Sequence, residues 1–192
     1  MKKAIVLAAL GVAAVGSSYG QGYINFNSYA QTVTPYPVAT VFGTATPLDS
    51  SFTAQLYYSL GTVLDPVDTG SAASIMSTVT GLSLFAGSDT PFAGGFFTGA
   101  TLTIGSYVSG PITFEVVAFN GVDYASSSIR GRSGAFTMSS IDTSGVGSVF
   151  GDNGGVMPVM FAASAAPVPE PSTLALAGLG GLAMLALRRK KA

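Results

Sequence analysis

The strongest structural signal in this sequence is the stretch Ile112-Thr113-Phe114-Glu115-Val116-Val117-Ala118-Phe119, in which β-branched and aromatic residues predominate. Side chains alternate between the two faces of a strand. We assign one face to the core because all its residues are apolar: Ile112, Phe114, Val116 and Ala118. The opposite face is only partly polar, and we expect Glu115 on it to be solvated.

A turn is predicted directly after this strand, at Asn120-Gly121. A two-residue hairpin would place Asp123 opposite Ala118 and so direct a carboxylate at the core, which is costly. A four-residue loop, 120–123, would instead pair Phe119 with Tyr124 and avoid that cost. We therefore favour the longer loop.

The rest of the middle region also predicts strands, because short runs rich in Thr, Val, Ile, Phe and Tyr alternate with Gly, Ser, Asn and Pro. The candidate strands are residues 23–27, 38–44, 53–60, 76–80, 82–86, 100–104, 112–119, 124–128, 134–138 and 156–161. No long segment combines helical periodicity with helix-forming residues. The expected fold is all-β, a single antiparallel β-sandwich or jelly-roll-like domain.

Residues 1–20 have the pattern of a secretory signal peptide. Two lysines, Lys2 and Lys3, precede an apolar run at 4–15, and a small, polar end follows. Ser18 and Gly20 are the small residues that favour cleavage between Gly20 and Gln21. The pattern predicts export, with the export machinery and a signal peptidase as partners.

The other end of the sequence carries a second apolar run. Residues 172–187 are sixteen residues with no charge and no proline, and a helix of that length rises about 24 Å. This is slightly short for a bilayer core about 30 Å thick. The basic cluster Arg188, Arg189, Lys190 and Lys191 follows and is expected to stay on the cytoplasmic side. We therefore expect a short hydrophobic helix that holds the chain in the membrane.

A proline-framed acidic motif precedes that run: Val168, Pro169, Glu170 and Pro171. Together, the motif, the short apolar helix and the basic end resemble the PEP-CTERM protein-sorting signal. The resemblance implies recognition and cleavage by an exosortase, a membrane-embedded cysteine transpeptidase. It also implies a diderm bacterium that makes exopolysaccharide, and delivery of the protein to the outer surface or extracellular matrix. An ordinary C-terminal membrane anchor with a proline-rich stalk is the alternative.

These segments divide the chain into a signal peptide (1–20), an exported β-rich domain (21–161), a small-residue and proline linker (162–167) and the sorting signal (168–192). Outside the targeting segments only Arg130 and Arg132 are basic, whereas eight residues are acidic: Asp49, Asp65, Asp68, Asp89, Glu115, Asp123, Asp142 and Asp152. The resulting net charge of about −6 argues against nucleic acid as a partner, since that needs a cationic face.

The residue types for common catalytic chemistry are missing. The sequence has no histidine and no cysteine, which excludes Ser-His-Asp and Cys-His catalysis and the usual zinc ligands. Glu115 and Asp123 are not spaced as the two carboxylates of a glycosidase. The Gly151-Asp152-Asn153-Gly154-Gly155 loop has oxygen ligands, but a calcium site needs six or more, so a plain turn is favoured. We expect neither an enzyme nor a cofactor.

Two residue groups are candidates for ligand contact. Arg130 and Arg132 could pair with an anionic polysaccharide, although pairing with aspartates of their own domain is favoured. Four tyrosines could stack on sugar rings, although ordinary packing is favoured for them: Tyr57, Tyr58, Tyr107 and Tyr124. Adjacent Tyr57 and Tyr58 must point to opposite sheet faces. The sequence thus favours a structural or adhesive matrix protein, with a carbohydrate-binding module as the alternative and exopolysaccharide as an expected partner.

Overall fold

Strand β7 (Ile112–Phe119) has the bounds predicted from the sequence and lies in the middle of the sheet. Along one edge it pairs with β3 (Thr53–Leu60) over its full length. Along the other edge it pairs with β8 (Ile129–Arg132) and β9 (Phe136–Met138). β7 is thus an interior strand, in agreement with its apolar and β-branched composition.

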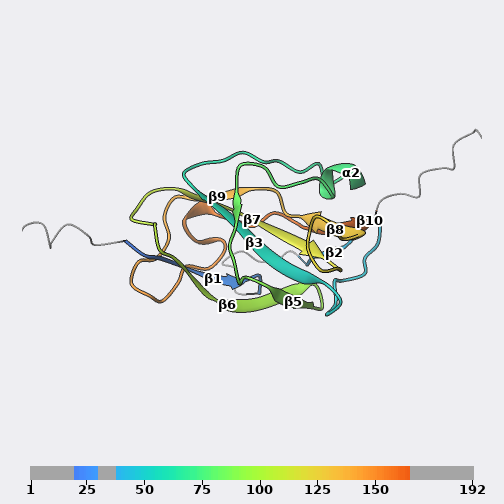
Figure 1. Cartoon of the computed structure of the whole chain (residues 1–192), viewed down its shortest axis with the longest axis horizontal. Coiled ribbons are helices and arrows are strands. Elements are labelled where there is room, and N and C mark those ends of the chain that lie inside the picture. The colour runs from blue at the N-terminus through green and yellow to red at the C-terminus, as the bar shows by residue number, and fades with distance from the viewer. Residues whose placement is uncertain (1–19, 30–37, 165–192) are drawn as a thin grey trace, which may run out of the picture.

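The computed structural model describes residues 20–29 and 38–164 and confirms the all-β fold (Figure 1). The other strands are β1 (Gly22–Asn27), β2 (Thr40–Val41), β4 (Ser83–Leu84), β5 (Thr90–Ala93), β6 (Phe96–Ile104) and β10 (Phe161–Ser164). Two short helical turns also lie in this part of the chain, α2 (Ala72–Ile75) and η1 (Asp152–Gly154).

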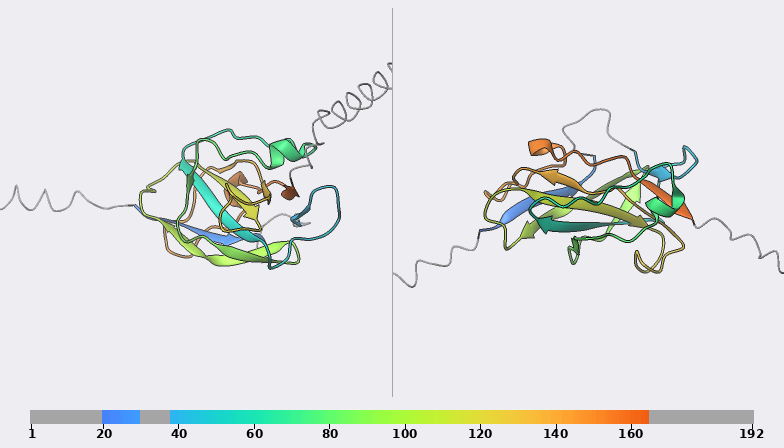
Figure 2. Two further views of the ribbon diagram at one scale, coloured as in Figure 1. Left: turned by 45° about the vertical axis from the view of Figure 1, so that its right-hand side comes forward. Right: turned by 90° about the horizontal axis from the view of Figure 1, so that it is seen from above.

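The strands form one curled sheet in the order β1-β6-β5-β3-β7-β8-β10-β2, with β4 paired to β3 and β9 paired to β7. The curl places β1, β6 and β5 across from β3 and β7, so that the sheet forms two layers (Figures 1 and 2). The pairing of β10 with β2 is parallel, which makes the sheet mixed rather than purely antiparallel. These two strands lie far apart in the sequence, so no hairpin requires them to be antiparallel.

The hydrophobic core lies between the two layers. The four residues of β7 assigned to the core are each 0% exposed, as predicted: Ile112, Phe114, Val116 and Ala118. Aromatic rings join the layers. The ring centroid of Phe150 lies 6.3 Å from those of both Phe26 on β1 and Phe114 on β7, and within one layer the ring centroids of Phe26 and Phe97 on β6 are 4.6 Å apart. Edge-to-face and tilted ring packing of this kind stabilises a core beyond the area that it buries.

Two predicted strands are wrong. Residues 76–80 leave α2 as a loop, and residues 124–128 form a turn. The helical turn begins because the Ser71 side chain accepts the Ser74 N–H at 3.3 Å, which is an N-cap. Two strands that the sequence did not predict are β5 and β8. Local hydrogen bonds from side chains to the backbone outweigh strand propensity in such short segments.

The chain after β7 turns back through a longer loop than expected, residues 120–128. Arg130 of β8 lies opposite Phe119, so the predicted pairing of Phe119 with Tyr124 is wrong. Side-chain oxygens accept backbone N–H groups within the loop: Asn120 from Ile129 at 3.3 Å and Asp123 from Ser126 at 2.8 Å. These bonds close the loop without strand pairing.

Strand β10 begins where the predicted strand 156–161 ends, and it continues into the predicted linker. Ser164 pairs with Ile129 of β8, and Phe161 pairs with Thr40 of β2. A linker that starts at residue 162 is therefore wrong, because the sheet continues to Ser164. β10 passes close to Gly131 of β8. A Cβ on residue 131 would overlap the Phe161 carbonyl, so this close approach requires glycine at that position.

The outer face of β7 is covered by the connection between β3 and β4, residues 61–82, which we call the cover segment. In Figure 1 it runs along the top of the molecule to α2 and back. Thr113 on this face fixes it, because its hydroxyl accepts the Val63 N–H at 3.0 Å and donates to the Gly61 carbonyl at 2.8 Å. Glu115 is consequently 0% exposed. The expectation of a solvated Glu115 is wrong, because the cover segment excludes water from this face.

Two predicted elements fall outside the described residues: the apolar part of the signal peptide and the hydrophobic helix at 172–187. Within residues 20–29 and 38–164, no helix is both long and apolar enough to span a bilayer.

Candidate functional site

Arg132 of β8 lies in the interior, 4% exposed, between two carboxylates. Its Nη1 is 2.6 Å from Asp65 Oδ2 and 2.9 Å from Glu115 Oε1. Its Nε donates to Ser77 Oγ at 3.0 Å, and Nη2 donates to the Pro66 carbonyl at 3.4 Å. Asp65, Arg132 and Glu115, the Arg132 cluster, thus tie the cover segment to β7 and β8.

The cluster holds one more carboxylate than guanidinium. Burial raises the pKa of Glu115 to about 7, an effect that Arg132 only partly offsets and the Asp65 charge reinforces. Its Oε2 has no hydrogen-bond partner among the described residues. The pKa of Asp65 is lowered, because the bonds from Arg132 and from the Thr80 N–H outweigh its desolvation. Glu115 is therefore the member of the cluster that titrates near neutral pH.

The two arginines differ in what they contact. Arg132 pairs with an aspartate of its own domain, as favoured from the sequence, and its burial removes it from any surface ligand. Arg130 forms no salt bridge with a described residue. Its Nε donates to the Met76 carbonyl at 3.0 Å, and Nη1 donates to the carbonyls of Tyr124 and Ala125. The guanidinium also lies 5.5 Å from the Tyr124 ring centroid, so Arg130 stabilises the 120–128 loop.

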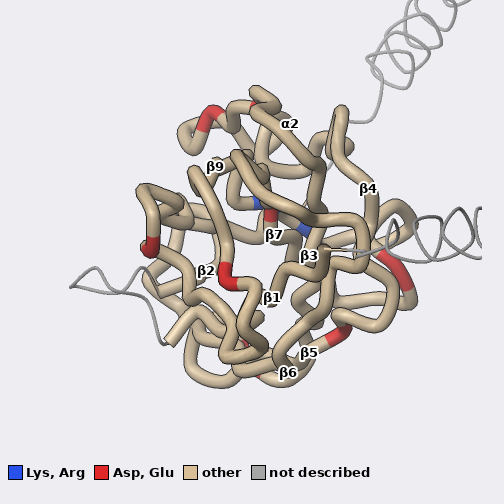
Figure 3. The backbone as a smooth tube through the Cα atoms, turned by 90° about the vertical axis from the view of Figure 1, so that its left-hand side faces the viewer, with Lys and Arg blue, Asp and Glu red and all other residues tan. Residues whose placement is uncertain are grey.

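Positive and negative charges are distributed differently over the described part of the chain. In Figure 3 the two arginine positions lie near the centre of the molecule, whereas most acidic positions lie on peripheral loops. Arg132 is buried and the guanidinium of Arg130 is held by backbone carbonyls. The outer surface is therefore acidic, which disfavours anionic ligands.

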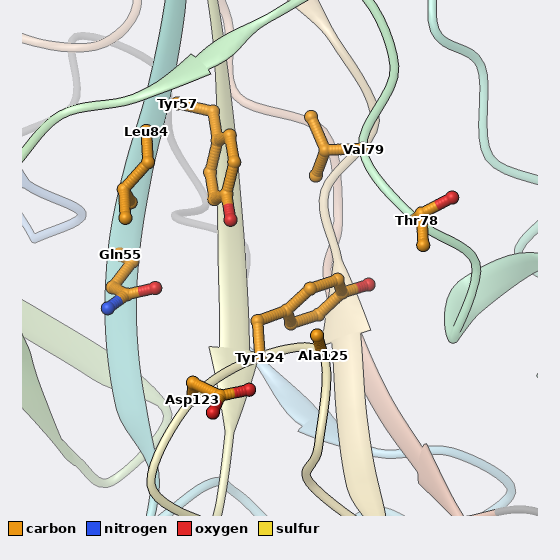
Figure 4. A pocket seen from close by; sticks show the side chains of 8 residues that line it. All are labelled: Gln55, Tyr57, Thr78, Val79, Leu84, Asp123, Tyr124 and Ala125. Atoms are coloured by element: carbon orange, nitrogen blue, oxygen red, sulfur yellow. The ribbon is translucent and has the colours of Figure 1, made fainter.

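A surface depression of about 410 Å³ lies beside the cover segment, over the outer face of β3. We call it the Tyr57 depression. Its lining combines apolar and polar side chains: Gln55, Tyr57, Thr78, Val79, Leu84, Asp123, Tyr124 and Ala125. Figure 4 shows the Tyr57 hydroxyl pointing toward Tyr124, with Val79 and Leu84 on opposite sides. Tyr57 pairs across the sheet with Leu84 of β4 and with Glu115 of β7.

The four tyrosines singled out in the sequence are not equivalent. Tyr57 and Tyr58 do lie on opposite faces, since Tyr57 packs with the small outer cluster and Tyr58 against the main core. Tyr107 is 1% exposed, and its hydroxyl donates to the Gly110 carbonyl at 2.8 Å. Tyr124 is 5% exposed, and its hydroxyl donates to the Ser77 carbonyl at 2.7 Å. Of these four, Tyr57 and Tyr124 line the depression, and the Tyr124 hydroxyl is already bonded to the Ser77 carbonyl.

Sequence reasoning did not single out Gln55, Val79 or Leu84. Strand alternation could have found Gln55, because it precedes Tyr57 by two residues on β3 and so shares its face. Nothing local in the sequence places Val79 there, because it reaches the depression only through the path of the cover segment.

Residues 151–155, for which the sequence favours a plain turn over a calcium site, contain the turn η1. Asp152 Oδ2 accepts the Val149 N–H at 3.0 Å, and the Asn153 side-chain amide donates to the Ser140 carbonyl at 2.9 Å. Both side chains therefore hold the turn. Across the described ranges, no group of three or more His, Cys, Asp or Glu residues is placed to hold a metal ion.

The predicted signal-peptidase site lies at the edge of the described residues. Gly20 and Gln21 directly precede β1, which begins at Gly22. The Gln21 side chain accepts the Tyr23 hydroxyl at 2.7 Å. The sorting motif Val168, Pro169, Glu170 and Pro171 and the basic cluster at 188–191 lie outside the described residues. The predicted cleavage between Gly20 and Gln21 stays a prediction.

Comparison with known proteins gives one finding, for the segment that follows β10. Residues 167–190 match the family model of the PEP-CTERM protein-sorting motif. No curated protein and no solved structure matches the chain. The motif implies export and recognition at the membrane by an exosortase. This chain therefore carries a PEP-CTERM protein-sorting motif at residues 167–190, directly after its all-β domain.

Proposed function

We propose that this protein is a non-enzymatic component of the cell surface or extracellular matrix, with a structural or adhesive role, processed at its PEP-CTERM motif. The observation that carries this proposal is the position of β10. The strand ends at Ser164, and only residues 165 and 166 separate it from the matched segment. The motif is thus attached to a strand that pairs on both edges, with β8 and with β2.

The segment that connects β10 to the sorting motif is therefore short. Glu170 lies six positions after Ser164, and an extended chain of six residues spans at most about 20 Å. The folded domain is therefore held close to the membrane until the chain is cut. Cleavage near residues 168–171 would release an acidic β domain outside the cytoplasmic membrane.

The chemistry of the domain supports a non-enzymatic role. The sequence has neither histidine nor cysteine. The charged groups of the Arg132 cluster, which pair with one another, lie beneath the cover segment, and their side chains are at most 8% exposed. Such a buried cluster suits cohesion of the fold better than contact with a substrate.

Intact-mass spectrometry of the protein from its own host tests the sorting step. We expect a chain that begins at Gln21 and ends near residues 168–171. Glu170→Ala should leave the chain uncut and in the cytoplasmic membrane, whereas Asp68→Ala, which removes an exposed carboxylate of the cover segment, should be processed normally. An intact mass that extends through Ala192 in the wild type would instead indicate an ordinary anchor.

The location of the cut form tests the matrix role. We expect it in the outer-surface or matrix fraction, and a strain lacking the protein should form a weaker matrix. Recovery of the cut protein only from the periplasm, with an unchanged matrix, would refute this role.

A carbohydrate-binding module is the second candidate, and the Tyr57 depression is the observation that favours it. A half-buried aromatic ring with polar groups at its rim is suited to stacking on a sugar and bonding its hydroxyls. The arginines proposed for this purpose from the sequence do not support it, because Arg132 is buried and Arg130 is held by backbone carbonyls.

A further inference from the structure

The apolar part of the Tyr57 depression consists of the Tyr57 ring and the aliphatic side chains on either side of it. The Tyr57 ring stands between Leu84 of β4 and Val79 of the cover segment (Figure 4). Tyr57 is half-buried, and Leu84 is 45% exposed. The Tyr57 hydroxyl has no hydrogen-bond partner among the described residues, whereas the hydroxyls of Tyr107 and Tyr124 are bonded. The ring is thus accessible, and its hydroxyl is free to bond a ligand.

The polar groups at the rim are mainly acceptors. The Gln55 amide nitrogen donates to Asp89 Oδ1 at 2.6 Å, which leaves its carbonyl oxygen available. Asp123 is exposed, and its pKa is lowered mainly by the Ser126 N–H, so it is ionised at neutral pH. Two acceptors beside one aromatic ring match a ligand that presents several hydroxyl donors.

The charges around the depression disfavour an acidic ligand. Asp123 lines the depression, Asp89 accepts a hydrogen bond from Gln55 at its rim, and the buried Glu115 lies opposite Tyr57 on the neighbouring strand β7. The nearest cation, Arg130, directs its guanidinium to the carbonyls of Met76, Tyr124 and Ala125. A uronic acid or sulfated sugar would therefore meet negative charge without an available cation.

We propose that the Tyr57 depression binds a neutral, hydroxyl-rich glycan, with a sugar ring against Tyr57 and its hydroxyls donating to Asp123 and Gln55. This inference rests on the carbohydrate-binding candidate function. It narrows the ligand class to uncharged sugars, whereas the arginines of the sequence had suggested anionic ones.

An array of neutral and uronic-acid-containing oligosaccharides, probed with the mature protein from its own host, tests this inference. We expect binding to at least one neutral glycan and to no acidic one. For that glycan, isothermal titration calorimetry should give affinities about tenfold weaker for Tyr57→Ala and about threefold weaker for Gln55→Ala. Tyr29→Ala, which changes an exposed tyrosine outside the depression, should bind as the wild type does.

The outcomes separate the two proposals. Binding of acidic glycans that depends on Tyr57 would overturn the neutral ligand but keep the carbohydrate-binding function. Binding to no glycan would reject both, and binding that neither Tyr57→Ala nor Gln55→Ala weakens would reject this site. Thermal unfolding of each variant shows whether it is folded, and Gln55→Ala provides the test if Tyr57→Ala is not.

Discussion

Arg132 Nη1 lies 2.9 Å from Glu115 Oε1, and both side chains are buried, at 5% and 0% exposure. The pair joins two neighbouring strands beneath the cover segment, and Asp65 adds a second carboxylate to the same guanidinium nitrogen. A buried ion pair need not raise stability, but removing one partner is costly because the other is left uncompensated. The cluster therefore leads to two predictions about stability.

Glu115 should make the protein less stable as the pH rises through neutrality. Its pKa is about 7 in the folded chain against an ordinary 4.5, so the folded state binds the proton more tightly. The contribution is fully present below pH 4.5 and is lost as the pH rises through about 7. Glu115→Gln should remove this dependence, a difference of about 1–3 kcal/mol in the free energy of unfolding between pH 5 and pH 8.

Urea unfolding at a series of pH values measures this effect. Asp123→Asn serves as the control, because it changes an exposed carboxylate and should keep the loss of stability above pH 5. The explanation fails if Glu115→Gln and the wild type lose the same free energy between pH 5 and pH 8.

Replacing Arg132 should destabilise the fold strongly. Arg132→Met leaves two carboxylates buried without their cation, which we expect to lower the free energy of unfolding by about 3–5 kcal/mol at pH 8. Arg130→Met, the matched control, should cost about 1 kcal/mol, because it removes bonds to backbone carbonyls at a half-buried position. Adding Glu115→Gln to Arg132→Met should recover part of the loss. Equal costs for the two arginines, by urea unfolding, would contradict the role of the cluster.

Gly131 should not tolerate a side chain. A Cβ at this position would overlap the Phe161 carbonyl, so Gly131→Ala must push β10 away from β8. We expect a cost of about 2 kcal/mol or more, as for other overpacked interiors. Gly105→Ala is the control, because open space surrounds its Cβ, and it should change stability by less than about 0.5 kcal/mol. A thermal midpoint for Gly131→Ala equal to that of the control would show that β8 and β10 are not so closely packed.

Reductant and chelator should leave the unfolding midpoint of the mature protein unchanged. The sequence has no cysteine, so no disulfide can be reduced. The carboxylate of Asp152 accepts a backbone N–H, which stabilises its turn without a metal. Differential scanning calorimetry with and without EDTA measures this. A fall of several degrees with EDTA would indicate a calcium site in the 151–155 loop.

The sequence by itself determined the elements whose signals are local. Strands β3 and β7 have the predicted bounds, because alternation and β-propensity agree along both. The core face of β7 followed from the same alternation. The motif at 168–171, the apolar run and the basic end form a contiguous signal, and the matched segment at 167–190 agrees with it.

Only the tertiary structure decided the outer face of β7. Alternation places Glu115 opposite the core, but it cannot show that the cover segment buries this face as well. Because water is excluded there, the buried Glu115 carboxylate pairs with Arg132. This pairing places Arg132 in the interior, away from the surface where a ligand could contact it. The same segment brings Val79 beside Tyr57 and so forms the depression. These contacts join residues far apart in the sequence. Their energies depend on how deeply the residues are buried, and a local sequence pattern does not show that.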